Sequence, residues 1–156
     1  MYRILVVSDS HGKTEYIKKQ ITTIEKFDLI IHLGDYLRDG LSLENTFPQY
    51  EFEIVKGNCE AHTTYGETEK LLDVCGKKIF ITHGDRYGVK MGYDRIIYKG
   101  FELEADCVLF GHTHMATKFK ENGILFLNPG AAKDNSCGII EIEDEKIEGC
   151  VLEGTW

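Results

Sequence analysis

The stretch CVLFGHTH, Cys107 to His114, runs from four consecutive apolar residues through a glycine into two histidines separated by one residue. Four apolar residues in a row are typical of a strand covered on both faces, and Gly111 lets the backbone turn tightly where that strand ends. In extended chain, residues two apart point the same way, which puts the backbones of His112 and His114 roughly 6 to 7 Å apart on one side. That spacing suits two neighbouring metal ions better than one. A lone histidine beside a strand is, however, more often a hydrogen-bonded surface or core residue, so the rest of the chain must decide.

Apolar runs of the same kind recur along the chain and favour a fold of alternating strands and helices. We expect strands at Tyr2 to Val7, Asp28 to Leu33, Glu51 to Val55, Lys78 to Thr82 and Asp106 to Phe110. Helical spacing of apolar residues predicts one helix after a cap at Thr14, through Ile17, Ile21 and Ile24, and another through Tyr93, Ile96, Ile97, Gly100 and Phe101. This alternation is typical of the α/β class.

Beyond residue 115 the pattern changes to paired strands. Asn122-Gly123 lies between two strand-like runs and is preferred in two-residue hairpin turns, and the chain turns again at Asp144 and Glu145. We expect half-exposed antiparallel strands here, because apolar residues alternate with glutamates in the second hairpin. A sheet with a parallel centre joined to such strands predicts two packed, mixed sheets flanked by helices. We expect a single domain over residues 1–156, since the sequence has no repeat, low-complexity tract or linker.

The composition restricts the class of protein. With 156 residues, of which 42% are hydrophobic, the chain can bury a sizeable core without disulfides. The net charge of −8 and the lack of a basic run disfavour non-specific binding to nucleic acid or to an anionic membrane. No apolar run approaches the length of about 18 residues that spans a membrane, and we see no signal peptide, so we expect a cytoplasmic protein without membrane contact. Five cysteines without a C-x-x-C pair fit reduced thiols and argue against a thiol or zinc-cysteine protein.

Each of the five expected strands ends in polar residues that can bind metal. The tips are Ser8-Asp9-Ser10-His11-Gly12, His32-Leu33-Gly34-Asp35, Gly57-Asn58-Cys59-Glu60, Thr82-His83-Gly84-Asp85 and Gly111-His112-Thr113-His114. Because the carboxyl ends of such strands lie along one edge, where ligands bind, we expect these tips to converge. Taken alone, Asp9 or Asp35 fits a helix cap and Asn58 a turn. Together, carboxylate, imidazole and one amide oxygen suit manganese, iron, nickel or zinc, whereas calcium would ask for more oxygens.

Two histidines fall outside these ligand patterns. His32 lies inside an apolar run, so we interpret it as a satisfied core histidine, with a hydrogen bond to a ligand carboxylate as its possible role. His62 lies in a polar stretch and is interpreted as a surface residue, although it is also an outside candidate for a proton donor.

The sequence resembles a known family, the calcineurin-like metallophosphoesterases. The residues that carry the resemblance are Asp9-x-His11, Gly34-Asp35, Gly57-Asn58, His83 and Gly111-His112-x-His114, and Asn128-Pro129-Gly130 resembles a later loop of this family. The short chain is similar to the small prokaryotic YfcE-like phosphodiesterase branch. The resemblance implies a four-layer α/β/β/α sandwich and two divalent metal ions. It places Asp9, His11, Asp35 and His114 around one ion, and Asp35, Asn58, His83 and His112 around the other. Asp35 would bridge them, in agreement with the spacing that puts His112 and His114 on different ions.

This arrangement implies hydrolysis of a phosphodiester. Two cations about 3.5 to 4 Å apart can share a water, lower its pKa toward about 7 and direct the hydroxide at phosphorus. The ions, with His112 and Asn58 nearby, would stabilise the negative charge that develops on the equatorial oxygens. We expect manganese, with nickel, iron and zinc as alternatives, and a small phosphorylated substrate attracted to the acidic protein by the bound cations.

The sequence departs from the family pattern at a few positions. Many relatives carry a histidine, thought to protonate the leaving oxygen, where this chain has Cys59, so a catalytic role for the Cys59 thiol is one interpretation and a bystander role is the other. Without a good acid, the enzyme should favour substrates with activated leaving groups. Glu60 and Asp85 also differ from the common residues, and we interpret both as loop anchors or as neighbours of the ligands. Ala131, where serine is frequent, is interpreted as structural.

Alternative functions keep the same fold. A retromer subunit shares it and is a protein-binding scaffold, but all seven ligand positions here hold competent residues. A phosphomonoesterase or nucleotide hydrolase would use the same site with different pocket walls, which we expect at residues 36–50 and 87–98. Aromatic residues in these segments are expected to pack in the core rather than stack on a base: Tyr36, Phe47, Tyr87 and Tyr93. Self-association through exposed edges, with Trp156 at the end of the chain, is a further hypothesis.

Overall fold

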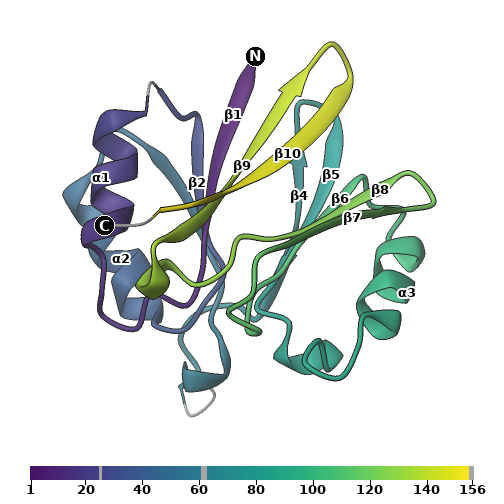
Figure 1. The fold of residues 1–156 in the computed structure, drawn as a ribbon, viewed down its shortest axis with the longest axis horizontal. Helices are drawn as coiled ribbons and strands as arrows, with labels where there is room; N and C mark the ends of the chain where they lie inside the picture. Colours follow the sequence, from purple (N-terminus) through teal and green to yellow (C-terminus); the bar gives the residue numbers. More distant parts are fainter. Residues whose placement is uncertain (25, 61–62, 155–156) are drawn as a thin grey trace.

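The computed structural model describes residues 1–24, 26–60 and 63–154, and its strands form two mixed sheets packed face to face between outer helices (Figure 1). The expected four-layer α/β/β/α sandwich is therefore confirmed. Helices α1 (Glu15–Thr23) and α2 (Leu37–Thr46) lie on the outer side of one sheet, and α3 (Asp94–Glu102) lies on the outer side of the other. No helix in the described part of the chain is long and apolar enough to span a bilayer.

The first sheet has a parallel centre and an antiparallel flank. Its strand order is β10-β9-β1-β2-β3, in which β1, β2 and β3 run parallel and β9 is antiparallel to both β1 and β10. The strands are β1 (Tyr2–Val7), β2 (Leu29–His32), β3 (Glu51–Ile54), β9 (Ser136–Glu143) and β10 (Lys146–Glu153).

The second sheet is built on the same plan. Its strand order is β4-β5-β6-β8-β7, with β5, β6 and β8 parallel and with β4 and β7 antiparallel at the two edges. The strands are β4 (Glu69–Val74), β5 (Lys77–Thr82), β6 (Cys107–Leu109), β7 (Thr117–Glu121) and β8 (Ile124–Asn128). Short 3₁₀ turns follow three strands: η1 (Asn58–Glu60), η2 (Asp85–Tyr87) and η3 (Ala132–Asp134).

Strand alternation divides the apolar residues between three layers of core. Ile4 and Val6 of β1 point between the sheets, where they belong to one cluster with Ile79 and Ile81 of β5. The neighbouring side chains of β1 point the other way and pack under α1 and α2, while α3 covers a third cluster on the second sheet. Two sheets that share a dry interior hold their strand ends at fixed relative positions.

Most elements lie where the sequence predicts them, and the exceptions have local causes. Helix α2 was not predicted, because its apolar residues are few and Gly40 is a weak helix former. Glycine is present there because a Cβ would lie 3.0 Å from Ile54 on β3. The edge strand β4 was also missed, since it carries charged residues among its apolar ones. The Thr14 hydroxyl makes no capping hydrogen bond, although α1 begins directly after it.

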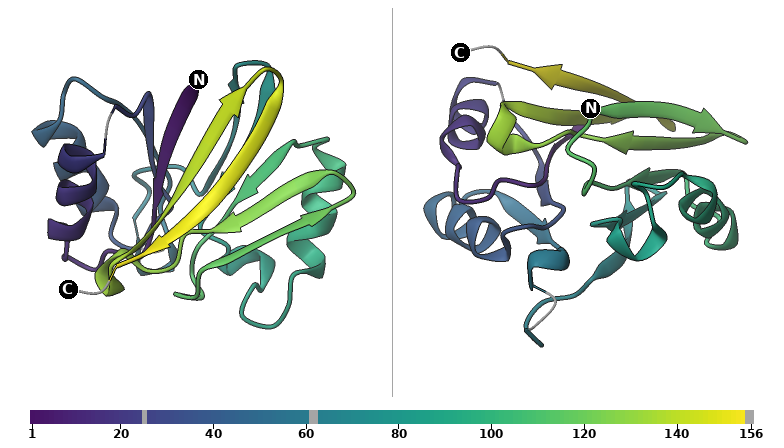
Figure 2. Two further views of the ribbon diagram at one scale, coloured as in Figure 1. Left: turned by 45° about the horizontal axis from the view of Figure 1, so that its top comes forward. Right: turned by 60° about the horizontal axis from the view of Figure 1, so that its bottom comes forward.

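The two predicted hairpins are present, but one strand was misjudged. Asn122 and Gly123 both adopt positive φ between β7 and β8, and Asp144 and Glu145 do so between β9 and β10. Figure 2 shows both hairpins from two further sides. Strand β8 pairs antiparallel with β7, as expected, but it is buried along its whole length, so the expectation of a half-exposed strand is wrong there. Both of its faces are covered, because Leu125 and Leu127 belong to the cluster between the sheets and Ile124 and Phe126 to the cluster under α3.

Candidate metal centre

The polar tips of β1, β2, β5 and β6 meet at one end of the sandwich, together with η1 after β3. In Figure 1, β1 runs downward from the chain start, and these tips lie toward the lower side of the molecule. Five of the predicted ligands adopt positive φ, a conformation that side-chain-bearing residues rarely take: Asp9, His11, Asp35, His112 and His114. Such strained backbone concentrates at functional sites, where the surrounding structure must hold it in place.

Asp9 is the centre of the cluster and is fully buried. Its Oδ1 lies 3.1 Å from Nε2 of His114, and 3.8 Å from Nε2 of both His11 and His83. Its Oδ2 accepts hydrogen bonds from the Ser8 hydroxyl at 2.6 Å and from the backbone amide of His112 at 3.1 Å. One carboxylate oxygen is thus held by the protein, while the other faces three imidazoles.

The two carboxylate oxygens of Asp35 also have different surroundings, one held by the protein and one facing imidazoles. Its Oδ1 accepts the backbone amide of Cys59 at 2.9 Å, and its Oδ2 lies 3.5 Å from Nε2 of His83 and 3.9 Å from Nε2 of His11. Burial alone would raise the pKa of this carboxyl, but hydrogen bonds from His83 and Cys59 and the charge of His83 hold the pKa below its usual range. Asp35 therefore stays ionised between two histidines that come from different strands.

A hydrogen bond to the backbone fixes the orientation of the His83 ring. Its Nδ1 donates to the backbone carbonyl of Leu33 at 2.8 Å, which turns Nε2 toward Asp9, Asp35 and Nδ1 of His112, at 3.2 Å. Burial by itself lowers the pKa of His83, but the hydrogen bond to Asp35 and the charges of Asp9 and Asp35 outweigh burial and raise the pKa. The negative potential that raises this pKa equally favours a metal cation at the same place.

His11 supplies the clearest sign of a missing partner. Its Nε2 is buried and has no hydrogen-bond partner in the described structure, yet it faces carboxylate oxygens of Asp9 and Asp35. An unsatisfied buried nitrogen is costly, so its retention calls for a ligand. Asp9, His11 and His114 form one group of donor atoms within 4.8 Å of one another, and Asp9, Asp35 and His83 form a second. These donors fit divalent metal ions.

Glycines allow these tips to approach one another. A Cβ on Gly57 would clash with Oδ1 of Asp35, one on Gly111 would clash with the Ser8 hydroxyl, and one on Gly34 would lie 2.6 Å from the amide nitrogen of Gly57. Close backbone approach is therefore the physical reason for glycine at all three motif positions.

His32 is the satisfied core histidine that the sequence predicts, but the suggested hydrogen bond to a ligand carboxylate is wrong. His32 is fully buried, and the backbone amide of Gly34 donates to its Nδ1 at 3.1 Å, so the proton is on Nε2, which lies 3.0 Å from the Ser10 hydroxyl. Ser10 in turn donates to Asp39 at 2.6 Å, and Asp39 also accepts the amide of Gly12 at 2.7 Å. This chain of hydrogen bonds ties the loop that carries Asp9 and His11 to β2 and α2.

Other predicted positions take structural or peripheral places. Asn58 and Cys59 are exposed at the start of η1, next to the cluster. Glu60 anchors the loop as expected, since its Oε1 accepts the amides of Leu37 at 3.0 Å and Gly57 at 3.1 Å. Ala131 is buried. His62 and Trp156 lie outside the described residues.

Sequence reasoning did not assign roles to several polar residues that hold the site. Ser8, Ser10 and Asp39 were not singled out, and Asn128 was noted only as part of a loop. Asn128 is buried and donates to the Gly111 carbonyl at 3.1 Å and to the Thr113 hydroxyl at 2.9 Å, which fixes the loop of His112 and His114. Its signal in the sequence is a polar residue at the end of the fully apolar run of β8.

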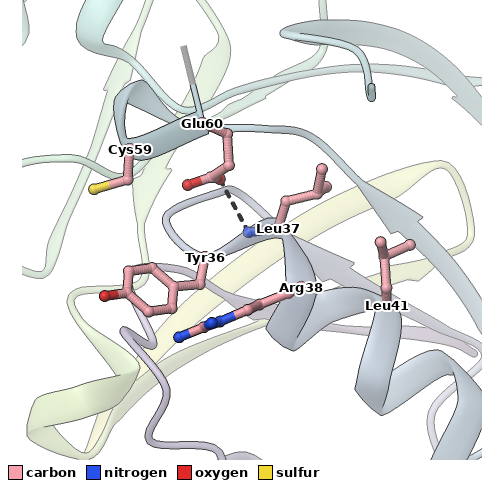
Figure 3. A pocket seen from close by; sticks show the side chains of 6 residues that line it. All are labelled: Tyr36, Leu37, Arg38, Leu41, Cys59 and Glu60. Atoms are coloured by element: carbon pink, nitrogen blue, oxygen red, sulfur yellow. Dashed lines mark hydrogen bonds between the residues drawn. The ribbon is translucent and has the colours of Figure 1, made fainter. Parts of the chain in front are cut away.

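A cavity of about 540 Å³ adjoins the cluster. Six residues line it: Tyr36, Leu37, Arg38, Leu41, Cys59 and Glu60 (Figure 3). Of the four aromatic residues considered for base stacking, Phe47, Tyr87 and Tyr93 pack against core clusters, as expected. Tyr36 instead borders the site, with its ring centroid 5.2 Å from that of His11.

Comparison with known proteins identifies the class to which this fold and this site belong. The profile of the calcineurin-like phosphoesterase superfamily domain matches residues 2–145, and the chain belongs to this family. The chain is similar to the probable metallophosphoesterase YsnB of Bacillus subtilis, with 36% identity over 136 residues, which cover 83% of this chain and 75% of the relative. A phosphodiesterase of Methanocaldococcus jannaschii is 26% identical over 97% of this chain and 99% of its own length.

Solved structures show the same fold. A predicted phosphoesterase of Streptococcus pneumoniae superposes with a TM-score of 0.81 at 27% identity, covering 97% of this chain and 89% of that protein. Vps29 of Chaetomium thermophilum superposes with a TM-score of 0.76 at 17% identity, covering 99% of this chain and 98% of its own, and at that identity it shows the fold alone. The family supports a phosphoesterase hydrolase that uses divalent metal ions, and the donor groups described above are candidates to hold them.

Proposed function

We propose that this protein is a dinuclear metal-dependent phosphodiesterase. The observation that carries the proposal is the unpartnered Nε2 of His11, which points at the oxygens of Asp9 and Asp35 among three further histidines. Names of relatives add support, since one of them is a phosphodiesterase and others are probable metallophosphoesterases.

Each predicted ligand has a role in this proposal. Asp35 would bridge two ions, since its Oδ2 lies 3.9 Å from Nε2 of His11 and 3.5 Å from Nε2 of His83. Asp9, His11 and His114 would hold one ion with it, and Asn58, His83 and His112 the other. When bound, two divalent ions would supply a nucleophile at neutral pH and neutralise charge on the phosphoryl group. Manganese is the proposed metal, with nickel, iron and zinc as alternatives, because the donors mix imidazole with carboxylate.

The protein's own residues prepare this site for the reaction. Leu33 holds the His83 ring, Ser8 holds Asp9, and the amide of Cys59 holds Asp35, so the ligands need little rearrangement. Asn58 and His112 are proposed to stabilise the negative charge that develops on the phosphoryl oxygens.

Cys59 is a weak candidate for the general acid. Although Cys59 is largely exposed, partial desolvation of its thiol, together with the hydrogen bond to Asp35 and that residue's charge, raises the pKa to about 11. A donor whose pKa lies so far above neutral pH gives up its proton poorly in the transition state. We therefore propose activated diesters, whose leaving groups need little protonation, as the preferred substrates, and the catalytic role of Cys59 stays a prediction.

Two alternatives use the same fold. Phosphomonoester or nucleotide hydrolysis would use the same ligands, and the likeness to Vps29 is compatible with a protein-binding scaffold. The complete set of ligand residues favours catalysis over the scaffold. A role in self-association through the edge strands also stays a prediction.

The test is hydrolysis of bis(4-nitrophenyl) phosphate and of 4-nitrophenyl phosphate by chelator-treated protein, with Mn²⁺, Ni²⁺, Zn²⁺ or Mg²⁺ restored singly. We expect metal-restored cleavage of the diester, and an Asp35→Asn variant should lower kcat/KM at least about 100-fold, because it keeps the shape but loses the bridging charge. Calorimetric metal binding by both proteins is the companion measurement. Tight metal binding without turnover of either ester would instead support the scaffold.

A further inference from the structure

The cavity lies directly beside the ligand cluster, within reach of a phosphoester bound there. Tyr36 borders both spaces, with its ring 5.2 Å from that of His11, and Cys59 on the opposite wall donates its amide to Asp35. A phosphate held at the cluster would have the cavity next to its ester groups. The volume of about 540 Å³ exceeds the need of a methyl group, and the cavity is open to solvent on the side of the exposed residues Arg38 and Cys59.

The walls are apolar where a ring would lie. Tyr36, Leu37 and Leu41 supply hydrocarbon and aromatic surface, and Figure 3 shows their side chains on one side of the cavity, with Cys59 and Glu60 on the other. Glu60 is tied into the wall, since its Oε1 already accepts the amides of Leu37 and Gly57. A flat apolar group is the occupant that such walls stabilise.

One residue of the lining adds charge selectivity. The Arg38 guanidinium lies over the Tyr36 ring, 4.7 Å from its centroid, and no carboxylate among the described residues pairs with it. Arg38 is exposed at the rim of the cavity, in a protein of net charge −8, and its planar fork suits a carboxylate or a phosphate.

We propose that this cavity binds one ester group of the substrate, and that this group is an aromatic ring carrying a second negative charge that pairs with Arg38. The assignment rests on the proposed phosphodiesterase function and adds the class of diester that the site selects. Arg38 is a specificity residue in this arrangement, and Tyr36 holds its guanidinium in position.

The test measures affinity and hydrolysis separately. The probes are phosphonate monomethyl esters that carry a methyl, benzyl, 4-carboxybenzyl or 4-aminomethylbenzyl group on phosphorus, because the carbon–phosphorus bond prevents loss of the ring. Titration calorimetry with the manganese-loaded protein should give about tenfold tighter binding for benzyl than for methyl. A further gain of about tenfold is expected for 4-carboxybenzyl, and salt should diminish it.

Variants separate Arg38 from general electrostatics. Arg38→Gln should remove the gain of the carboxylate, and Arg38→Glu should reverse the preference toward 4-aminomethylbenzyl. Arg95→Gln is the matched control, an exposed arginine on α3 at the other side of the sandwich, and should retain the wild-type order.

The outcomes distinguish the two proposals. Equal affinity for all four probes, or a carboxylate gain that survives Arg38→Gln, overturns the cavity assignment even if bis(4-nitrophenyl) phosphate is hydrolysed. Failure to hydrolyse that diester with any metal, while the affinity order is retained, overturns the phosphodiesterase proposal and supports the cavity as a site for ring anions.

Discussion

One atom, Nε2 of His11, is unfavourable for folding but suited to metal binding. It is buried without a partner, a situation that costs about 1 to 3 kcal/mol unless a ligand satisfies the group. Replacing the imidazole by a ring of similar shape removes that cost and removes the metal ligand at the same time.

His11→Phe should therefore have opposite effects in two conditions. In chelator, we expect a free energy of unfolding that is unchanged or raised by up to about 1 kcal/mol. Metal affinity should fall by about tenfold or more, since one imidazole donor is lost. Urea unfolding and calorimetry measure the two quantities. A destabilised metal-free protein with normal metal affinity would mean that His11 is a packing residue and no ligand.

His32 makes the stability of the metal-free protein depend on pH. Burial lowers the pKa of His32 to about 4, and the charge of His83 acts in the same direction, against the opposing charges of Asp39, Asp9 and Asp35. The pKa of this histidine is higher in the unfolded chain. At pH values between the two pKa values, the unfolded state therefore binds a proton that the folded state does not. The contribution of neutral His32 is thus complete above about pH 6.5 and is lost as pH falls toward 4.

We expect wild-type protein in chelator to lose about 2 to 3 kcal/mol more of its free energy of unfolding than a His32→Asn variant when pH falls from 7.5 to 4.5. Asparagine retains an acceptor for the amide of Gly34 but cannot be protonated. In the difference between the two proteins, the contributions of the other titrating groups to the pH dependence cancel. They include His83, whose raised pKa acts in the opposite direction. Parallel pH profiles would show that His32 does not titrate in this window.

The loops at the strand ends depend on glycine for reasons that differ between positions. Gly57 has an ordinary backbone conformation, and only the closeness of Asp35 excludes a side chain there. Gly76, in the turn between β4 and β5, has a φ of +79° and open space around it. Alanine at the two positions therefore has different consequences.

Gly57→Ala should lower kcat/KM for a diester by about 100-fold, because the methyl group displaces the Asp35 carboxylate from its ligand position. Gly76→Ala should destabilise the protein by about 1 kcal/mol through backbone strain, yet keep full activity. Steady-state kinetics and thermal unfolding of both variants provide the comparison. Equal activity of the two variants would contradict the close approach of Gly57 to Asp35.

Metal binding should connect the two sheets of the sandwich. Asp9 and Asp35 follow strands of the first sheet, whereas His83, His112 and His114 follow strands of the second. Ions held by both groups bind the folded state and stabilise it by mass action, by about 2.7 kcal/mol at one hundred times the dissociation constant.

For a chain of this length, that stabilisation corresponds to a rise in Tm of about 5 to 10 °C on adding Mn²⁺, reversed by chelator. Calorimetric unfolding measures it, and Asp35→Asn should show a much smaller rise. Amide exchange should slow at the ends of β1, β2, β5 and β6 together. Protection confined to one sheet would contradict a site shared between them.

The amino-acid sequence was sufficient to predict the α/β class, the central strands, the two hairpin turns and the types of residue at the strand ends. These follow from local properties: apolar periodicity, the φ preferences of glycine and asparagine, and the chemistry of individual side chains. Helix α2 and strand β4 escaped prediction because their local patterns are weak, and packing on a neighbouring element decides them.

Which atoms come into contact could be seen only in the folded chain. The buried chain of hydrogen bonds from His32 through Ser10 to Asp39 and the anchoring of the His112 loop by Asn128 join residues from separate segments. No periodicity encodes such contacts, because they depend on how two sheets and their loops are positioned in space. The motif residues indicated a metal site from the sequence. The cavity beside it could be found only in the folded chain, because segments that are apart in the sequence form its walls.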